Sequence, residues 1–67
     1  VMDIQKIISR LIEMNPDQVL ELLRSLVGSN DKGRYLAETL VIDLADHDDL
    51  FDGLCKLDPK FIGELYG

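Results

Sequence analysis

The stretch NPDQVLELLRSLVG, from Asn15 to Gly28, predicts one complete α-helix together with its start and its end. Proline suits the first helical position and disfavours helix in the residue before it, so we expect Asn15 to cap the helix and Pro16 to open it. Asp17 favours the positively polarised N-terminal end, and Gly28 is the natural stop. At helical spacing, the residues expected to be buried are Val19, Leu20, Leu22, Leu23, Leu26 and Val27.

The apolar residues keep helical spacing on both sides of this stretch, and no strand-like alternation of useful length is present. A first helix is expected after Asp3, and a third from about Asp31 or Gly33 to Ala45. Residues 29–33 are expected to form the one flexible loop.

A fourth helix is expected from about Asp48 to Leu57, and Asp58-Pro59 repeats the Asn-Pro pattern at the start of a short last helix. The predicted fold is therefore all α: a compact bundle of four to five short helices joined by Asn-Pro, Asp-Pro and Gly turns. Residues 1–67 form a single helical domain, either as a whole protein or as a fragment of a larger one.

The length of 67 residues and the hydrophobic content of 46% predict a marginal core. A chain of this size buries only about 60% of the surface that its unfolded form exposes. A homodimer that completes the core across a shared interface is therefore one possibility. Cys55, the one cysteine, cannot form an internal disulfide, and no signal-peptide pattern or long apolar run is present. These features predict a soluble intracellular protein, cytoplasmic or nuclear, without membrane contact.

The net charge of −6 comes entirely from the second half of the chain. Five basic and five acidic residues cancel within residues 1–35, whereas eight acids outnumber Lys56 and Lys60 within residues 36–67. Nucleic-acid binding requires clustered Lys and Arg, which this chain lacks, so neither DNA nor RNA is expected as a partner. The acidic half suits a basic protein or peptide.

Five aspartates surround the chain's one histidine, His47, and we expect them to form an acidic surface. An EF-hand loop starting at Asp48 would have Leu50 at its third position and Pro59 at its twelfth, where calcium requires oxygen ligands. One histidine and one cysteine are too few for a zinc site, so no metal is expected. Asp46 or Asp48 is expected to cap the fourth helix, while a proton-sensing role for His47 stays open. The five aspartates of the expected acidic surface are Asp43, Asp46, Asp48, Asp49 and Asp52.

Catalytic chemistry has little support in the sequence. Cys55 shares an apolar stripe with Phe51, which is typical of an inert core thiol, and no glycine-rich phosphate loop follows a strand. We therefore expect neither enzymatic activity nor a cofactor.

The third helix carries apolar residues on two sides. Tyr35 and Ile42, seven residues apart, fall opposite the face that contains Leu36, Leu40 and Leu44. Either this helix is central and covered on both sides, or Tyr35 and Ile42 contact a partner.

The segment Lys6–Asn15, KIISRLIEMN, resembles the K-I-T-G-M-L-L-E-I-D stretch of the MLLE domain at the C-terminus of poly(A)-binding proteins. The resemblance covers residues 6–25 and, more loosely, 34–47, and it implies a helical bundle whose grooves hold short, partly hydrophobic peptides. Ser9 and Arg10 replace the glycine and methionine of the motif, and the family's leading helix has no counterpart. The identical positions are Lys6, Ile7, Leu11 and Glu13.

Three classes of function remain. The favoured one is a non-catalytic helical module that binds a peptide or helix in an apolar groove. The alternatives are a homo-oligomerisation or assembly domain, and an acidic regulatory inhibitor that mimics nucleic acid. A capping piece of a helical-repeat array is also open, because residues 14–23 and 57–66 are similar. The candidate partner-binding residues are Lys6, Ile7, Leu11, Glu13, Tyr35, Ile42, Phe61 and Tyr66.

Overall fold

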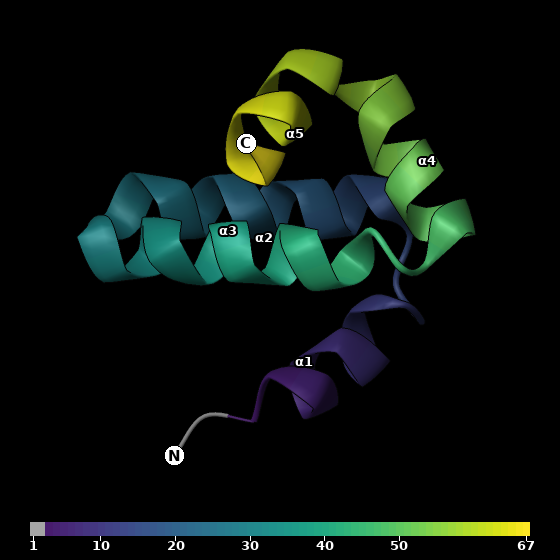
Figure 1. Ribbon diagram of the computed structural model, residues 1–67, viewed down its shortest axis with the longest axis horizontal. Helices are drawn as coiled ribbons and strands as arrows, with labels where there is room; N and C mark the ends of the chain where they lie inside the picture. Colours follow the sequence, from purple (N-terminus) through teal and green to yellow (C-terminus); the bar gives the residue numbers. More distant parts are fainter. Residues whose placement is uncertain (1–2) are drawn as a thin grey trace.

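A computed structural model describes residues 3–67, and every regular element in this part of the chain is an α-helix (Figure 1). The prediction of a small all-α bundle is confirmed. The five helices are α1 (Ile4–Leu11), α2 (Pro16–Ser29), α3 (Asp31–Leu44), α4 (Asp48–Leu57) and α5 (Pro59–Tyr66).

Helices α2 and α3 form an antiparallel pair across the middle of the molecule (Figure 1). Helices α4 and α5 pack on one side of this pair, and α1 packs against α3 on the other side. Helix α3 therefore contacts all four other helices, as expected for a central helix. The expectation that α3 would be covered on both sides is wrong, because the side chains of Tyr35 and Ile42 remain exposed.

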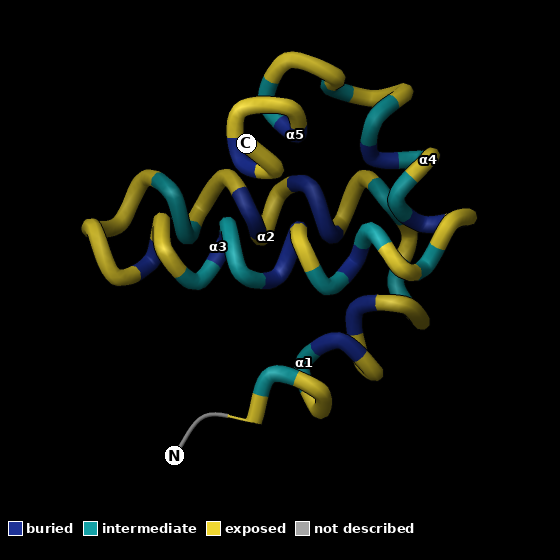
Figure 2. The backbone as a smooth tube through the Cα atoms, in the orientation of Figure 1, coloured by how far each residue is buried: buried dark blue, intermediate teal, exposed yellow. Residues whose placement is uncertain are grey.

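The core consists of aliphatic side chains from all five helices, and Figure 2 marks the backbone of the buried residues in dark blue. One prediction for α2 is wrong: Leu22 is 38% exposed, because it lies about 100° around the helix from Leu23. The core residues are Ile8, Leu11, Val19, Leu20, Leu23, Ala37, Leu40, Val41, Leu44, Leu50, Leu54, Ile62 and Leu65.

The joint between α2 and α3 is far tighter than predicted. Helix α2 continues through Gly28 to Ser29, and Asn30 alone separates it from α3, so the flexible loop expected at residues 29–33 does not exist. The Asn30 side chain accepts a 2.8 Å hydrogen bond from the Gly33 amide and thereby caps α3. Asparagine favours the helix N-cap, which allows the second helix to begin directly after it.

Asp3, Asn15 and Asp58 occupy the N-cap positions of α1, α2 and α5, as expected from the sequence. Asp3 Oδ1 accepts from the amides of Gln5 (3.1 Å) and Lys6 (3.3 Å). Asn15 occupies the N-cap of α2, and its own amide donates to Gln18 Oε1 at 3.1 Å. Pro16 and Pro59 occupy first-turn positions of α2 and α5, as the two X-Pro pairs predict.

The cap predicted for α4 is wrong. His47 occupies the N-cap position and makes no side-chain capping bond, while Asp48 and Asp49 lie in the first turn of α4. The chain turns sharply here, because the amides of Asp46 and His47 donate back to the carbonyls of Asp43 (3.2 Å) and Leu44 (2.9 Å). Asp46 therefore lies one residue before the N-cap position, and Asp48 lies one residue after it.

Candidate protein-interaction site

An open apolar groove lies between the start of α1 and the first turns of α3. We call it the α1–α3 groove; its volume is about 450 Å³ and it is lined by Ile4, Lys32, Tyr35, Leu36 and Thr39. Ile4 and Leu36 are half-buried against the core, whereas Tyr35 is 72% exposed. The groove therefore has an apolar floor and a protruding aromatic ring on one wall.

A line of side chains continues along α3 beyond the groove. Ile42 is 54% exposed and follows Tyr35 by seven residues, which places it on the same side of the helix about 10 Å farther along. Thr39 lies between them, and its hydroxyl donates to the Tyr35 carbonyl at 3.0 Å. We call Tyr35, Thr39 and Ile42 the α3 stripe.

Acidic side chains gather where the α3 stripe ends. Asp43 and Asp46 follow Ile42, and Asp48 and Asp49 begin α4. Within residues 3–67 none of these four carboxylates forms an ion pair, whereas Asp52 pairs with Lys56 at 3.1 Å. We call the four unpaired aspartates the acidic joint.

A smaller hollow of about 260 Å³ lies beside the acidic joint, between the end of α1 and the start of α4. Its apolar surface comes from Ile12, which is exposed, and from Leu50, which is buried. His47, Asp48 and Asp49 complete the lining. The hollow thus combines an apolar surface with two carboxylates.

The candidate residues on α1 divide between core and surface. Leu11 is only 2% exposed and belongs to the core, and Ile7 is half-buried against it, so the Leu11 side chain is not available to line a groove. Lys6 and Glu13 are exposed. The apolar residues through which α1 resembles the MLLE motif therefore hold α1 to the rest of the bundle.

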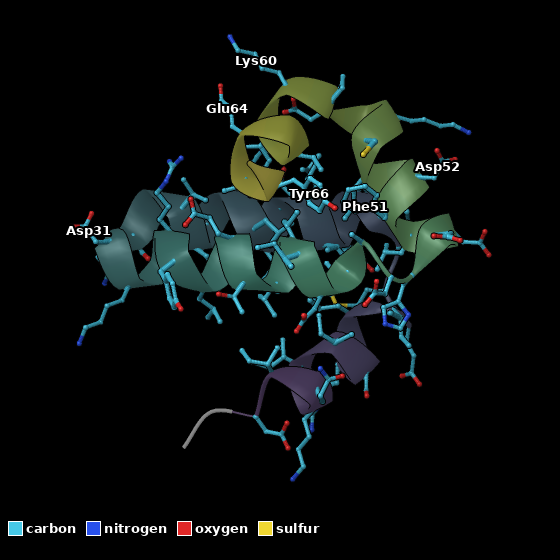
Figure 3. The ribbon with its side chains drawn as sticks, viewed as in Figure 1. Asp31, Phe51, Asp52, Lys60, Glu64 and Tyr66 are labelled. Carbon is cyan, nitrogen blue, oxygen red and sulfur yellow. The ribbon has the colours of Figure 1, made fainter. Side chains whose placement is uncertain are left out.

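The candidate aromatic residues of α5 make contacts inside the molecule. The Tyr66 ring lies 5.6 Å from the Phe51 ring of α4, with 57° between the ring planes (Figure 3). The Arg24 guanidinium lies 5.9 Å from the centre of the half-buried Phe61 ring. Phe61 and Tyr66 thus contact neighbouring helices, although the Tyr66 side chain is also 53% exposed.

Asp58 connects α2 with α5. It accepts from Arg24 Nη2 at 2.7 Å and from the Phe61 amide at 3.1 Å. The bond from Arg24 is the main cause that lowers the pKa of the Asp58 carboxyl from its ordinary value, and the bond from the Phe61 amide adds to it. The ionised form of Asp58 is therefore the one that the folded chain stabilises.

We expect Asp58 to make folding stability depend on pH below about 4. Because the folded pKa is lowered, its stabilising contribution is complete above the unfolded pKa of about 3.9 and is lost as the pH falls through the folded value. The measurement is urea unfolding of the wild type and of Asp58→Asn at pH 7, 5, 4 and 3, since asparagine also caps helices. The wild type should be the more stable protein at pH 7, and the difference should shrink below pH 4. A difference that is constant across these pH values would contradict the assignment.

A third concave region, which the sequence did not predict, lies between α2 and α4. Two adjoining hollows of about 530 and 510 Å³ share Asp17 and Leu57, and Leu57 is 53% exposed. Leu57 is the last residue of α4 and follows the buried Leu50 by seven residues. Arg24 lines one hollow and is already paired with Glu21 and Asp58. This region therefore offers fewer unpaired charges to a partner than the acidic joint.

Among residues 3–67, no three His, Cys, Asp or Glu side chains are arranged to hold a metal ion. Cys55 is a half-buried free thiol. None of the helices in the described chain is long and apolar enough to span a membrane.

Comparison with known proteins yields no relative: no protein family matches the sequence, and neither a curated protein nor a solved structure is detectably similar to the chain. The resemblance to the MLLE domain therefore stays a prediction.

Proposed function

We propose that this chain is a non-catalytic protein-interaction module that binds an apolar peptide or helix through the α1–α3 groove and the α3 stripe. The observation that carries the proposal is the exposure of Tyr35 and Ile42, two turns apart on one side of the central helix. Isolated exposed apolar residues are ordinary on protein surfaces. Tyr35 lines a groove whose floor is already apolar, and Ile42 follows it along the same side of α3.

The use of aromatic residues supports the same conclusion. The chain has four aromatic side chains, two Phe and two Tyr, and none of them is among the fully buried core residues. Tyrosine is enriched at protein interfaces, because its ring supplies apolar area while its hydroxyl remains compatible with water. Tyr35 has no aromatic neighbour among the described residues, whereas Tyr66 packs on Phe51. A ring that is left exposed beside a groove is available to a partner.

The small size of the α1–α3 groove and the α3 stripe predicts a transient interaction. Full burial of an aliphatic or aromatic side chain contributes about 1.5–3 kcal/mol, and association entropy offsets much of the sum. With two main anchors and a groove, we expect a dissociation constant on the order of micromolar. The MLLE resemblance suggests the same class of ligand, a short and partly hydrophobic segment.

The proposal predicts which substitutions weaken binding. Peptides are selected from a random display library against the wild type, and their affinities are then measured for Tyr35→Ala, Ile42→Ala and Leu57→Ala. Leu57 is the matched control, because its exposed fraction of 53% nearly equals the 54% of Ile42 and it lies outside the groove. We expect Tyr35→Ala and Ile42→Ala each to weaken binding by about tenfold, and Leu57→Ala by less than about twofold.

Two results would count against the proposal. One is a library that yields no peptide, and the other is a set of peptides whose affinity depends on Leu57 and not on Tyr35. Amide shifts in NMR spectra give an independent map, with the largest changes expected in residues 32–42 and at Ile4.

The predicted alternative, an assembly domain, uses the same exposed residues. The α3 stripe of one chain would then pack on the α3 stripe of a second chain. Sedimentation at protein concentrations covering a hundredfold range separates the two proposals: a stable dimer that Ile42→Ala dissociates would favour assembly, and a constant monomer would favour a different partner.

A further inference from the structure

We infer that the partner of the α3 stripe is a basic amphipathic helix, with apolar residues seven positions apart and Lys or Arg residues that lie against the acidic joint. This inference rests on the proposed function and adds the chemistry of the partner.

The charge along the exposed side of α3 is uneven. Lys32 lies at the groove end, and Asp43 and Asp46 lie at the other end, followed by Asp48 and Asp49. Since no basic side chain among residues 3–67 pairs with these four carboxylates, their charges are available to a partner. The partial negative charge at the C-terminal end of α3 is offset by the partial positive charge at the N-terminal end of α4, so the excess negative charge comes from the four carboxylates. Basic residues of a partner are therefore favoured at this end of the stripe.

The hollow at Ile12 has the chemistry of a site for one long basic side chain. Lys and Arg pack their methylene groups on apolar surface while the charged end group stays in a polar setting. Ile12 and Leu50 supply the apolar surface here, and Asp48 and Asp49 supply the carboxylates. A purely aliphatic side chain would contact the apolar surface and leave the carboxylates without a partner, and an acidic side chain would be repelled by them.

The spacing along α3 favours a helical partner. Tyr35 and Ile42 are two turns apart, and residues repeating every seven positions keep two packed helices in contact. The acidic joint follows Ile42 directly, in the last turn of α3 and in the turn that leads into α4. The basic residues of the partner are therefore expected beyond its second apolar anchor.

A second copy of this chain fits the site less well. Each copy has a net charge of −6, and pairing the two stripes would bring two acidic joints into one assembly. Like charges at an interface oppose association, whereas a basic helix would be attracted and would bind faster at low salt.

The test compares two synthetic amphipathic peptides that share leucines seven residues apart and differ only in their flanks, which carry lysines in one and glutamates in the other. NMR titration of the wild type gives the affinity and the shifted amides at low and at moderate salt. We expect the lysine peptide to bind at least about tenfold tighter, and this advantage to shrink at the higher salt concentration. The largest shifts are expected along the α3 stripe and the acidic joint.

Two double variants with equal net charge separate the effect of the carboxylates in the acidic joint from the effect of total charge on peptide binding. Asp43→Asn with Asp46→Asn removes two charges of the acidic joint, and Asp31→Asn with Glu64→Gln removes two exposed charges elsewhere, both labelled in Figure 3. The first pair should abolish most of the preference for the lysine peptide, and the second should preserve it. If both double variants lost the preference for the lysine peptide equally, net charge alone would determine that preference, and the inference would be overturned.

The remaining outcomes distinguish the inference from the proposed function. If both peptides shift Tyr35 and Ile42 with equal affinity, the site binds helices without the basic preference, and the inference alone fails. If neither peptide shifts the α3 stripe, both the inference and the proposed function fail. A chain that dimerises by itself through the stripe would identify a second copy as the occupant and overturn the inference.

Discussion

Replacing Leu23 by alanine is expected to lower the free energy of unfolding by about 2–5 kcal/mol. Leu23 is 0% exposed and lies on α2, which packs against α3 and α4, so its truncation leaves a cavity where elements meet. A domain of this length has a total stability of about 3–10 kcal/mol, since native proteins gain about 0.05–0.15 kcal/mol per residue. We therefore expect Leu23→Ala to lose a large part of the stability of the fold, as measured by circular dichroism during urea titration at 25 °C.

The adjacent residue provides the control for this prediction. Leu22→Ala makes the same chemical change one position earlier on the same helix, where the side chain is partly exposed. Because less apolar area is lost and alanine has the better helix propensity, we expect a cost below about 1 kcal/mol. Equal losses for Leu22→Ala and Leu23→Ala would contradict the packing of α2 described above.

Gly33→Ala is expected to destabilise the fold by about 1–3 kcal/mol through steric overlap. Gly33 is buried in the first turn of α3, and a Cβ atom there would collide with the Leu26 carbonyl oxygen and with Ser29 Oγ of α2. The Leu26 oxygen belongs to the backbone and also accepts the Ser29 hydroxyl at 2.8 Å, so neither group yields without loss. Thermal unfolding followed by circular dichroism measures this loss.

Gly28→Ala is expected to have the opposite effect on the stability of the fold. Gly28 is helical and exposed, and nothing lies within 4 Å of the position that its Cβ would occupy. Alanine there is expected to raise the stability by up to about 1 kcal/mol, because glycine loses more conformational freedom on folding. If both glycine variants were stabilised, the close approach of α3 to the last turn of α2 would be refuted.

The functional proposal depends on which surfaces the fold covers. Helix α3 is central, and Tyr35 and Ile42 are nevertheless left exposed on it. A helix can contact four others and still present one side, because α1 covers α3 only in part and leaves the α1–α3 groove open. The candidate site is thus a consequence of how α1 is placed against α3.

The local sequence was enough to predict the helices and most of their starts. Two helix starts were predicted from X-Pro pairs, Asn15-Pro16 and Asp58-Pro59. Their capping hydrogen bonds join residues only a few positions apart, so these helix starts depend on the local sequence. Helical spacing likewise predicted the burial of Val19, Leu20 and Leu23. The acidic cluster after Ile42 was also evident from the order of the residues.

Tertiary structure decided which side of each helix is covered. Leu22 and Leu57 have apolar side chains like those of the core, yet both are more than one third exposed in the folded chain. Leu11 was a candidate surface residue and is buried because α1 packs on α3. Gly33 appeared to be a turn residue and proved to be a point of close contact between α2 and α3. Caps and turns depend on neighbours in sequence, whereas burial depends on residues that are distant in sequence, and only the assembled bundle brings those residues together.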